Sequence, residues 1–296
     1  MKVAVTGSSG LIGSALLPAL AAAGHEPVPM VRNDARPGEL RWDPATGAID
    51  DAGLAGTDAI VNLAGESIAA RWTEDRKRRI LESRVAGTKL IAETAARLEP
   101  KPSVLLCASA VGFYGSRGDD ELTETSAKGD GFLAAVVGAW EAAAQPARDA
   151  GIRVVHLRHG LVLSQRGGAL ARLLLPFRLG LGGRVGSGDQ WWSWVAMEDV
   201  TAAYVSLLEL PLSGPVNLVA PEPARNRDFV KSVGRALHRP AVLPFPSLAV
   251  RAVLGEMGVA LLLASQRALP AALETGGLEF RCRTLSEGLE SALSRG

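Results

Sequence analysis

The chain has 296 residues, of which 47% belong to the set AVILMFWYC and 21% are charged. This balance is typical of a globular protein and excludes a mainly disordered or collagen-like chain. Lysine and arginine total 32 and aspartate and glutamate total 31, so the net charge of +1 gives no whole-chain field to hold nucleic acid or an anionic membrane.

Two further classes are excluded by residue types. The cysteines, Cys107 and Cys282, form no CxxC and can build neither a disulfide framework nor a zinc site, and the four histidines lack ligand spacing. We therefore expect no metal. The uncharged run 3–25 is interrupted by four glycines, so it indicates a strand, a turn and a helix rather than a membrane span or a signal segment. The sequence predicts a soluble, cytoplasmic protein.

Over the first 160 residues, short apolar runs alternate with alanine-rich or amphipathic segments. The predicted strands are Lys2–Thr6, Pro27–Val31, Leu40–Asp43, Ala59–Leu63, Ser103–Ser109 and Ile152–Leu157, and the predicted helices are Leu11–Ala23, Thr73–Leu98 and Phe132–Asp149. The prolines at 27 and 29 predict an irregular start to the second strand. This alternation is typical of an α/β protein with a parallel, doubly wound sheet.

The second half of the chain is less regular and contains the glycine-rich stretch 180–188. The predicted helices are Asp199–Glu209, Asn226–Leu237 (opened by a capping Asn or Asp) and Ser286–Leu293, and Val216–Val219 is a predicted strand. We expect a core formed by residues 1–160, to which 195–220 return. A smaller C-terminal α/β lobe would then comprise residues 161–194 and 221–296.

The strongest local signal is a glycine-rich turn directly after the first strand. Glycines at 7, 10 and 13 allow a sharp turn, close approach of the backbone to a pyrophosphate, and close packing of helix on strand. The residues that would contact a dinucleotide are Gly7, Ser9, Gly10, Leu11, Ile12 and Gly13. The alternative is a plain turn whose glycines serve packing alone.

The end of the second predicted strand indicates which dinucleotide would bind. An NAD-selective site would place Asp or Glu here, about 20 residues past the loop, but the chain has Val31, Arg32 and Asn33. A guanidinium at this position can pair with a 2′-phosphate through two hydrogen bonds. We therefore predict NADP(H) rather than NAD, with an ordinary surface arginine as the alternative.

Further motifs carry a family resemblance. Asn62-Leu63-Ala64-Gly65, and Ser109 with Tyr114 in SAVGFYG, resemble extended short-chain dehydrogenases/reductases. The segments NLAGESIAARWTEDRKRRILESR, LLPFRLGLGG and GSGDQWWSWVAMEDV are similar to an atypical subgroup. These are the nucleoside-diphosphate-sugar epimerase-like proteins of the NAD(P)-dependent epimerase/dehydratase family, which have their own C-terminal segment. The resemblance implies a Rossmann core, an NADP(H) site and a small substrate-binding lobe.

Residues after the fourth predicted strand complete the expected cofactor site. Small residues at Leu63, Ala64 and Gly65 would leave room for the adenosine and ribose at the carboxyl end of the sheet. Glu66 would meet either the cofactor or a basic partner. Arg84 lies in the motif ending in SR, and the resemblance makes it a candidate phosphate contact.

The expected catalytic residues are incomplete. Relatives of this kind imply a tyrosine acid/base, a lysine four residues later that favours phenolate, and a serine or threonine. Neither tyrosine of this chain, Tyr114 or Tyr204, is followed by lysine at that spacing. Counting back along the helix, the two positions fall on Leu133 and Val137.

Ser109 and Tyr114 are then the remaining catalytic candidates. Ser109 would hydrogen-bond a substrate carbonyl, and Tyr114 would act as a weaker acid or else be a packing aromatic. Lys128 could enter the site, but a solvated lysine is the simpler interpretation. Asp199 is predicted to be a helix cap or a structural partner.

Three of the six tryptophans, Trp191, Trp192 and Trp194, lie within four positions. They could stack on a ligand ring or seal the lobe against the core. The sequence as a whole predicts an NADP(H)-dependent oxidoreductase or epimerase-like protein acting on a small carbonyl or nucleotide-sugar compound. Its partner would be a small molecule, with no nucleic acid and no membrane, and a homodimer stays open. The alternative is a catalytically weak NADP(H)-binding regulatory or interaction protein.

Overall fold

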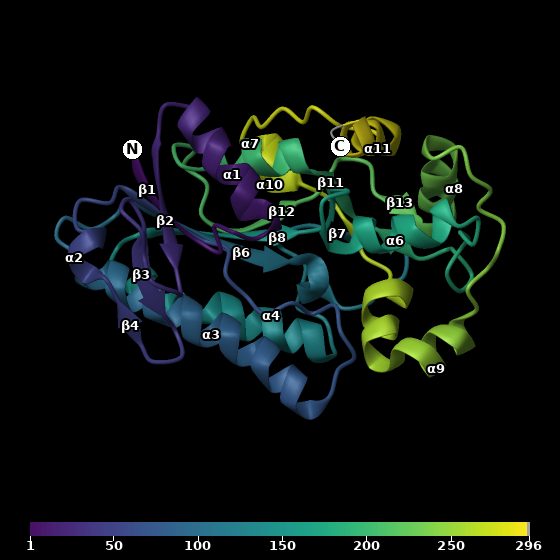
Figure 1. The fold of residues 1–296 in the computed structure, drawn as a ribbon, viewed down its shortest axis with the longest axis horizontal. Helices are drawn as coiled ribbons and strands as arrows, with labels where there is room; N and C mark the ends of the chain where they lie inside the picture. The colour runs from purple at the N-terminus through teal and green to yellow at the C-terminus, as the bar shows by residue number, and fades with distance from the viewer. Residues whose placement is uncertain (295–296) are drawn as a thin grey trace.

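The computed structural model describes residues 1–294 and is built on one central eight-stranded sheet (Figure 1). The strand order is β12-β8-β6-β5-β1-β2-β3-β4, and every neighbouring pair is parallel except β3 with β4. The bounds are β1 Lys2–Thr6, β2 Glu26–Val31, β3 Leu40–Asp43, β4 Ala48–Ile49, β5 Ala59–Asn62, β6 Val104–Ala110, β8 Arg153–His159 and β12 Gly214–Leu218. The predicted doubly wound sheet is confirmed. Because β1 lies between β2 and β5, the direction of winding reverses there, and ligands of such sheets bind in the crevice at that point.

Helices cover both faces of this sheet (Figure 1). One face carries α1 (Leu11–Ala22), α7 (Met197–Ser206) and the short α10 (Ala271–Thr275), and the opposite face carries α3 (Glu74–Arg97), α4 (Phe132–Ala142) and α5 (Gln145–Asp149). The single turn α2 (Asp51–Leu54) joins β4 to β5.

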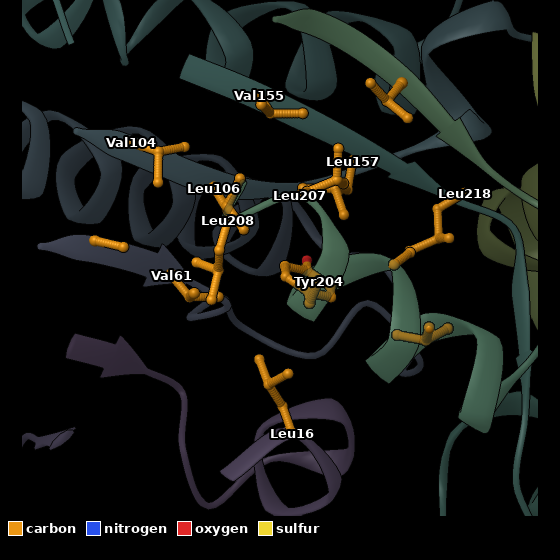
Figure 2. Packing of buried hydrophobic residues seen from close by; sticks show 14 of the residues in the cluster. Leu16, Val61, Val104, Leu106, Val155, Leu157, Tyr204, Leu207, Leu208 and Leu218 are labelled. Carbon is orange, nitrogen blue, oxygen red and sulfur yellow. The ribbon is translucent and has the colours of Figure 1, made fainter. Parts of the chain in front are cut away.

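The core on the first face is a continuous apolar layer. Figure 2 shows Leu16 of α1 and Tyr204 of α7 among the strand side chains of Val61, Leu106 and Leu157, all fully buried. Burial of each large apolar side chain contributes roughly 1.5–3 kcal/mol, so this layer fixes the position of α1 on the sheet.

Most of the rest of the chain forms a C-terminal lobe at the end of the molecule away from β3 and β4 (Figure 1). Its helices are α6 (Gly168–Arg178), α8 (Asn226–Ala236), α9 (Ser247–Gly258) with the π-helical turn η2 (Val259–Leu263), and α11 (Leu285–Ser294). Three short strand pairs complete it: β9 (Leu161–Leu163) with β11 (Trp194–Ala196), β10 (Trp191–Trp192) with β13 (Ala224–Arg225), and β14 (Arg267–Ala268) with β7 (Glu121–Leu122). No helix within residues 1–294 has the length and apolar character needed to cross a membrane.

Two predicted elements differ from the structure. The single helix predicted over 132–149 is two helices, because Pro146 cannot continue a helix and instead occupies the first turn of α5. The predicted irregular start of β2 is wrong, since the strand pairs regularly with β1 from Glu26 onward. Both prolines are tolerated because β3 pairs only with Met30 and Val31, so the outer edge of β2 beside the prolines has no strand partner.

The two polar residues expected to cap helices of the second half have other partners. Arg225, not Asn226, precedes α8 as its cap, and the Asn226 side chain accepts a hydrogen bond from the Val185 N–H at 2.8 Å. Asp199 accepts from the N–H groups of Arg281 and Cys282 at 2.7 and 3.1 Å. Asp199 is therefore a structural partner that ties the C-terminal segment to α7.

Candidate functional site

The glycine-rich turn lies between β1 and α1, and its packing depends on glycine at two positions. Gly7 has φ +64°, and a Cβ there would lie 2.9 Å from the backbone carbon of Leu63. A Cβ on Gly13 would lie 2.3 Å from the Gly7 carbonyl oxygen and 2.7 Å from the Ser8 Cα. All three contacts are closer than a real Cβ atom approaches its neighbours, so the turn, α1 and the end of β5 can pack this tightly only with glycine at these positions.

The N-terminus of α1 is open to an anion. Its cap residue, Gly10, provides no side-chain hydrogen bond, and the first turn contains no acidic residue. Helix N-termini of this kind present unpaired N–H groups and a partial positive charge. Ser9 is exposed, while Leu11 and Ile12 are partly buried. The turn therefore fits the phosphates of a dinucleotide.

Leu11 also brings this turn against the C-terminal lobe. A Cβ on Gly168, at the start of α6, would lie 3.0 Å from a methyl carbon of Leu11. The lobe therefore meets the core directly beside the glycine-rich turn.

The segment after β5 forms the second wall of the crevice. The Thr6 hydroxyl donates to Asn62 at 2.7 Å and accepts from the N–H groups of Leu63 and Ala64 at 3.1 and 3.3 Å. Asn62 in turn donates to Thr88 of α3 at 2.8 Å. These bonds pin the end of β5 to β1, so the predicted cofactor residues of both segments lie side by side.

Arg84 holds the backbone of this second wall at Gly65 and Glu66. Its Nη1 donates to the carbonyl of Glu66 at 2.9 Å, and its guanidinium carbon would lie 3.2 Å from a Cβ on Gly65. The guanidinium also stacks over Trp140 at 5.0 Å, and burial lowers its pKa to about 10, so it stays charged at neutral pH. The Glu66 carboxylate pairs with Arg76. In this structure Arg84 positions the backbone at 65–66; a direct phosphate contact stays a prediction.

Arg32 lies just past the end of β2, exposed to solvent. Within residues 1–294 its guanidinium has neither an ion-pair nor a hydrogen-bond partner. All of its donors are thus available to a ligand.

Ser109 and Tyr114 belong to one buried polar network, together with three residues that the sequence analysis missed. The Ser109 hydroxyl donates to Glu141 at 2.6 Å, and the Arg158 guanidinium donates to both oxygens of that carboxylate at 2.8 Å. Arg158 also donates to the Tyr114 hydroxyl at 3.0 Å, and Tyr114 donates to Asn217 at 2.7 Å. Strand register explains the arrangement, because Ser109 on β6 and Asn217 on β12 both pair with Arg158 on β8.

The environment of Glu141 determines its protonation state and the direction of its hydrogen bond with Ser109. Burial raises the pKa of Glu141, but hydrogen bonds from Arg158 and Ser109 outweigh burial, and the pKa lies below its usual value. Glu141 is therefore ionised at neutral pH and can only accept hydrogen bonds. In this structure the single Ser109 proton points to Glu141; a hydrogen bond from Ser109 to a substrate carbonyl stays a prediction.

Tyr114 is likewise held in the interior. The side chain has no exposed surface, and burial raises its pKa despite the nearby Arg158. Tyr114 packs edge-on against Phe113, with ring centroids 5.4 Å apart. In this structure Tyr114 packs and forms hydrogen bonds in the interior, as the alternative interpretation expects; a role as an acid stays a prediction. Leu133 and Val137 line the same region, since both would contact a Cβ on Gly112.

The three neighbouring tryptophans have two different environments. Trp192 and Trp194 are buried in the core of the lobe, where Trp192 packs edge-on against Phe229 and the Trp194 indole donates to the Glu222 carbonyl. Trp191 is partly exposed, and the guanidinium groups of Arg225 and Arg267 lie over its ring, 4.5 and 4.8 Å from the ring centroid. Its indole N–H donates to Asp119 at 2.7 Å, so Trp191 joins the lobe to the loop before β7.

Replacing Arg158 with alanine is expected to lower the free energy of unfolding by about 3–5 kcal/mol, because it leaves a buried, ionised Glu141 without its partner. Chemical denaturation would measure the loss. Arg78→Ala is the matched control, since Arg78 pairs with Asp75 on the surface and such pairs contribute under about 1 kcal/mol. Equal losses for the two variants would show that the network does not stabilise the fold.

Comparison with known proteins agrees with this geometry. Residues 3–219 match the model of the NAD dependent epimerase/dehydratase family, and residues 245–292 match a domain of unknown function, DUF1731. The chain is 45% identical over 296 residues to "Epimerase family protein Mb2239" of Mycobacterium bovis, covering 99% of this chain and 98% of that one.

Two solved structures are also similar. The crystal structure of the human epimerase family protein SDR39U1 (isoform 2) with NADPH superimposes with a TM-score of 0.92 at 36% identity, covering 100% of both chains. A nucleoside-diphosphate sugar epimerase from Corynebacterium glutamicum superimposes with a TM-score of 0.82 at 40% identity, covering 99% of this chain and 58% of that chain. The expected Rossmann fold is thereby confirmed.

Proposed function

Because the chain belongs to the NAD-dependent epimerase/dehydratase family, we propose that it binds NADP(H) and acts as an oxidoreductase or epimerase on a small carbonyl or nucleotide-sugar compound. The observation that carries this proposal is the uncapped N-terminus of α1 behind the glycine-rich turn, with an unpaired Arg32 at the end of the neighbouring strand. The NADPH bound to the human relative supports the choice of cofactor.

Each part of the crevice would hold a different part of the cofactor. The N–H groups of residues 10–13 would receive the pyrophosphate, Arg32 the 2′-phosphate, and the backbone at 63–65 the adenosine and its ribose. When bound, the cofactor supplies or accepts the hydride, and the protein holds and orients it. Arg84, through the Glu66 carbonyl, would keep the second wall in place.

A second candidate function is NADP(H) binding without efficient catalysis, in a regulatory or interaction role. The proton of Ser109 points to Glu141, Tyr114 is fully buried, and Leu133 and Val137 stand at the expected dyad positions. These observations favour the second candidate. Oxidation of NADPH in the presence of a panel of carbonyl compounds and sugar nucleotides distinguishes the two: turnover above the cofactor-only rate supports an enzyme, and its absence despite binding supports the alternative.

Arg32→Asp is expected to reverse the cofactor preference. The substitution replaces a cation that would face the 2′-phosphate with an anion that would repel it and accept hydrogen bonds from a ribose. We expect NADPH affinity to fall by about 100-fold, which corresponds to about 2.7 kcal/mol, while NADH affinity stays the same or rises. Calorimetric titration of both cofactors measures the shift.

The control for this substitution is Arg148→Gln, which removes an exposed arginine of α5 that forms no ion pair within residues 1–294. It should leave both affinities unchanged. If Arg32→Asp retained the preference of the unmodified chain, Arg32 would not read the 2′-phosphate.

A further inference from the structure

A second, independent site is indicated by a shallow surface hollow at the C-terminal end of α8. The hollow has a volume of about 670 Å3, and its lining includes Lys231, Arg235, His238, Arg239 and Val242 but no acidic residue. It lies in the C-terminal lobe, whereas the glycine-rich turn lies at the start of α1 (Figure 1). The balanced net charge of the whole chain therefore conceals a local concentration of positive charge.

Among the described residues, no acidic side chain pairs with the lysine or the arginines of this hollow. Within residues 1–294, neither Lys231, Arg235 nor Arg239 forms an ion pair, although many other arginines of the chain do. Lys231 and Arg235 are four residues apart on α8, a spacing at which like charges destabilise a helix. The only acidic residue of α8, Asp228, lies in its first turn and does not line the hollow. An anionic ligand would relieve this repulsion.

The backbone at His238 is a further sign of a built site. The helix ends in a Schellman motif, with hydrogen bonds from the His238 N–H to the Arg235 carbonyl at 3.0 Å and from the Arg239 N–H to the Gly234 carbonyl at 2.9 Å. The position held by His238 is usually glycine, because its φ of +53° is left-handed; in residues 1–294 no other non-glycine residue has a positive φ. The helix dipole favours a cation at this end but does not explain histidine in place of glycine. The strained backbone places the imidazole at the hollow.

We propose that this hollow binds a phosphate-bearing anion. Two arginines, a lysine and a histidine can together donate several charge-assisted hydrogen bonds to one phosphate or diphosphate group. Two sources carry this chemistry, a soluble polyphosphate and a phospholipid headgroup. Val242, which also lines the hollow, is 74% exposed, and the adjoining Leu243 is 47% exposed, so an apolar rim lies beside the cations.

The test is calorimetric titration of the full chain with inorganic pyrophosphate, with and without saturating NADPH. Binding that persists in the presence of NADPH is expected, because the hollow is separate from the glycine-rich turn. Lys231→Gln/Arg235→Gln should weaken binding at least 10-fold. The matched control, Arg41→Gln/Arg79→Gln, removes two exposed and unpaired cations elsewhere and should not change it.

A second arm distinguishes the two sources of phosphate. Sedimentation with phosphatidylcholine vesicles, with and without phosphatidylglycerol, tests for a headgroup. Association that requires phosphatidylglycerol and is lost in the double variant identifies a lipid, and pyrophosphate binding alone identifies a soluble ligand. The proposal is overturned if neither ligand binds, or if the control variant loses as much affinity as Lys231→Gln/Arg235→Gln. The comparison of Lys231→Gln/Arg235→Gln with its control and the vesicle sedimentation need no NADPH, so their outcomes do not depend on whether NADPH binds.

His238→Gly separates a binding role from a structural one. Glycine removes the strain at the left-handed position, so the melting temperature should rise. Anion affinity should fall about threefold through loss of the imidazole. A higher melting temperature with unchanged anion affinity would remove His238 from the site and contradict this explanation of the strain.

Discussion

Replacing Gly13 with alanine is expected to reduce NADPH affinity by at least about 100-fold. The added Cβ would lie 2.3 Å from the Gly7 carbonyl oxygen and 2.7 Å from the Ser8 Cα. Both of these atoms belong to the backbone, so no side chain can turn away to make room. Either α1 moves off β1 or the turn is distorted, and both changes displace the N–H groups that would hold the pyrophosphate.

Calorimetric titration with NADPH measures this effect, and circular dichroism establishes that the variant is folded. Gly87→Ala is the control, because it makes the same change inside α3, where the new Cβ would meet the Trp42 ring and Pro44 at ordinary distances of 3.4 Å and more. The control should bind NADPH as the unmodified chain does. If folded Gly13→Ala bound NADPH with undiminished affinity, the glycine-rich turn would not be the cofactor site.

Lowering the pH from 7 to 4 is expected to destabilise the protein by several kcal/mol, mainly through two buried histidines. Burial lowers the pKa of both His156 and His159 to about 4. Below about pH 6.5, the pKa of histidine in the unfolded chain, the unfolded chain binds protons that the folded chain does not. The contribution of the two histidines to the free energy of unfolding is therefore fully present above that pH and is lost as the pH falls toward about 4. Each histidine accounts for roughly 3 kcal/mol of this loss.

Other groups contribute less in this window. Glu141, whose folded pKa is lowered, adds to the acid loss only below about pH 4.5. Asp199, whose pKa is raised by burial against hydrogen bonds from Arg281 and Cys282, opposes the loss. The histidines therefore determine the sign of the change.

Urea denaturation at pH 7 and pH 5 tests this expectation. His156 is the better target, because its Nε2 is buried without a hydrogen-bond partner, whereas His159 contacts the Ser109 carbonyl and the Tyr204 hydroxyl. His156→Leu should reduce the difference in stability between the two pH values by about half. A pH difference in His156→Leu as large as in the unmodified chain would contradict the account.

The parts of the fold that could be predicted from the sequence are those that a few neighbouring residues determine. The glycine-rich turn, the strands of the first half and the start of α3 each depend on a few adjacent residues. Thr73, for example, caps α3 by accepting from the Arg76 N–H, and acidic residues follow it in the first turn. Where a single residue overrides the local pattern, as Pro146 does, the prediction failed.

The polar network could not be predicted because its members come from five separate elements: β6, η1 (Val111–Tyr114), α4, β8 and β12. Ser109, Arg158 and Asn217 are aligned only by the register of β6, β8 and β12, and the register between strands cannot be inferred from the sequence of any one strand. One signal was present. Arg158 lies in an interior strand of the sheet, between β6 and β12, and a buried arginine requires an acidic partner. Glu141, the acidic residue of an apolar helix, is that partner.

Calorimetric titration of the unmodified chain with NADPH and NADH is the most direct measurement of the central claim, that the crevice between the glycine-rich turn and residues 63–66 is an NADP(H) site. We expect NADPH to bind with micromolar or tighter affinity and NADH to bind at least about 10-fold more weakly, because NADH lacks the phosphate that Arg32 would pair with. Equal affinities would refute the role of Arg32, and no binding of either cofactor would refute the site itself.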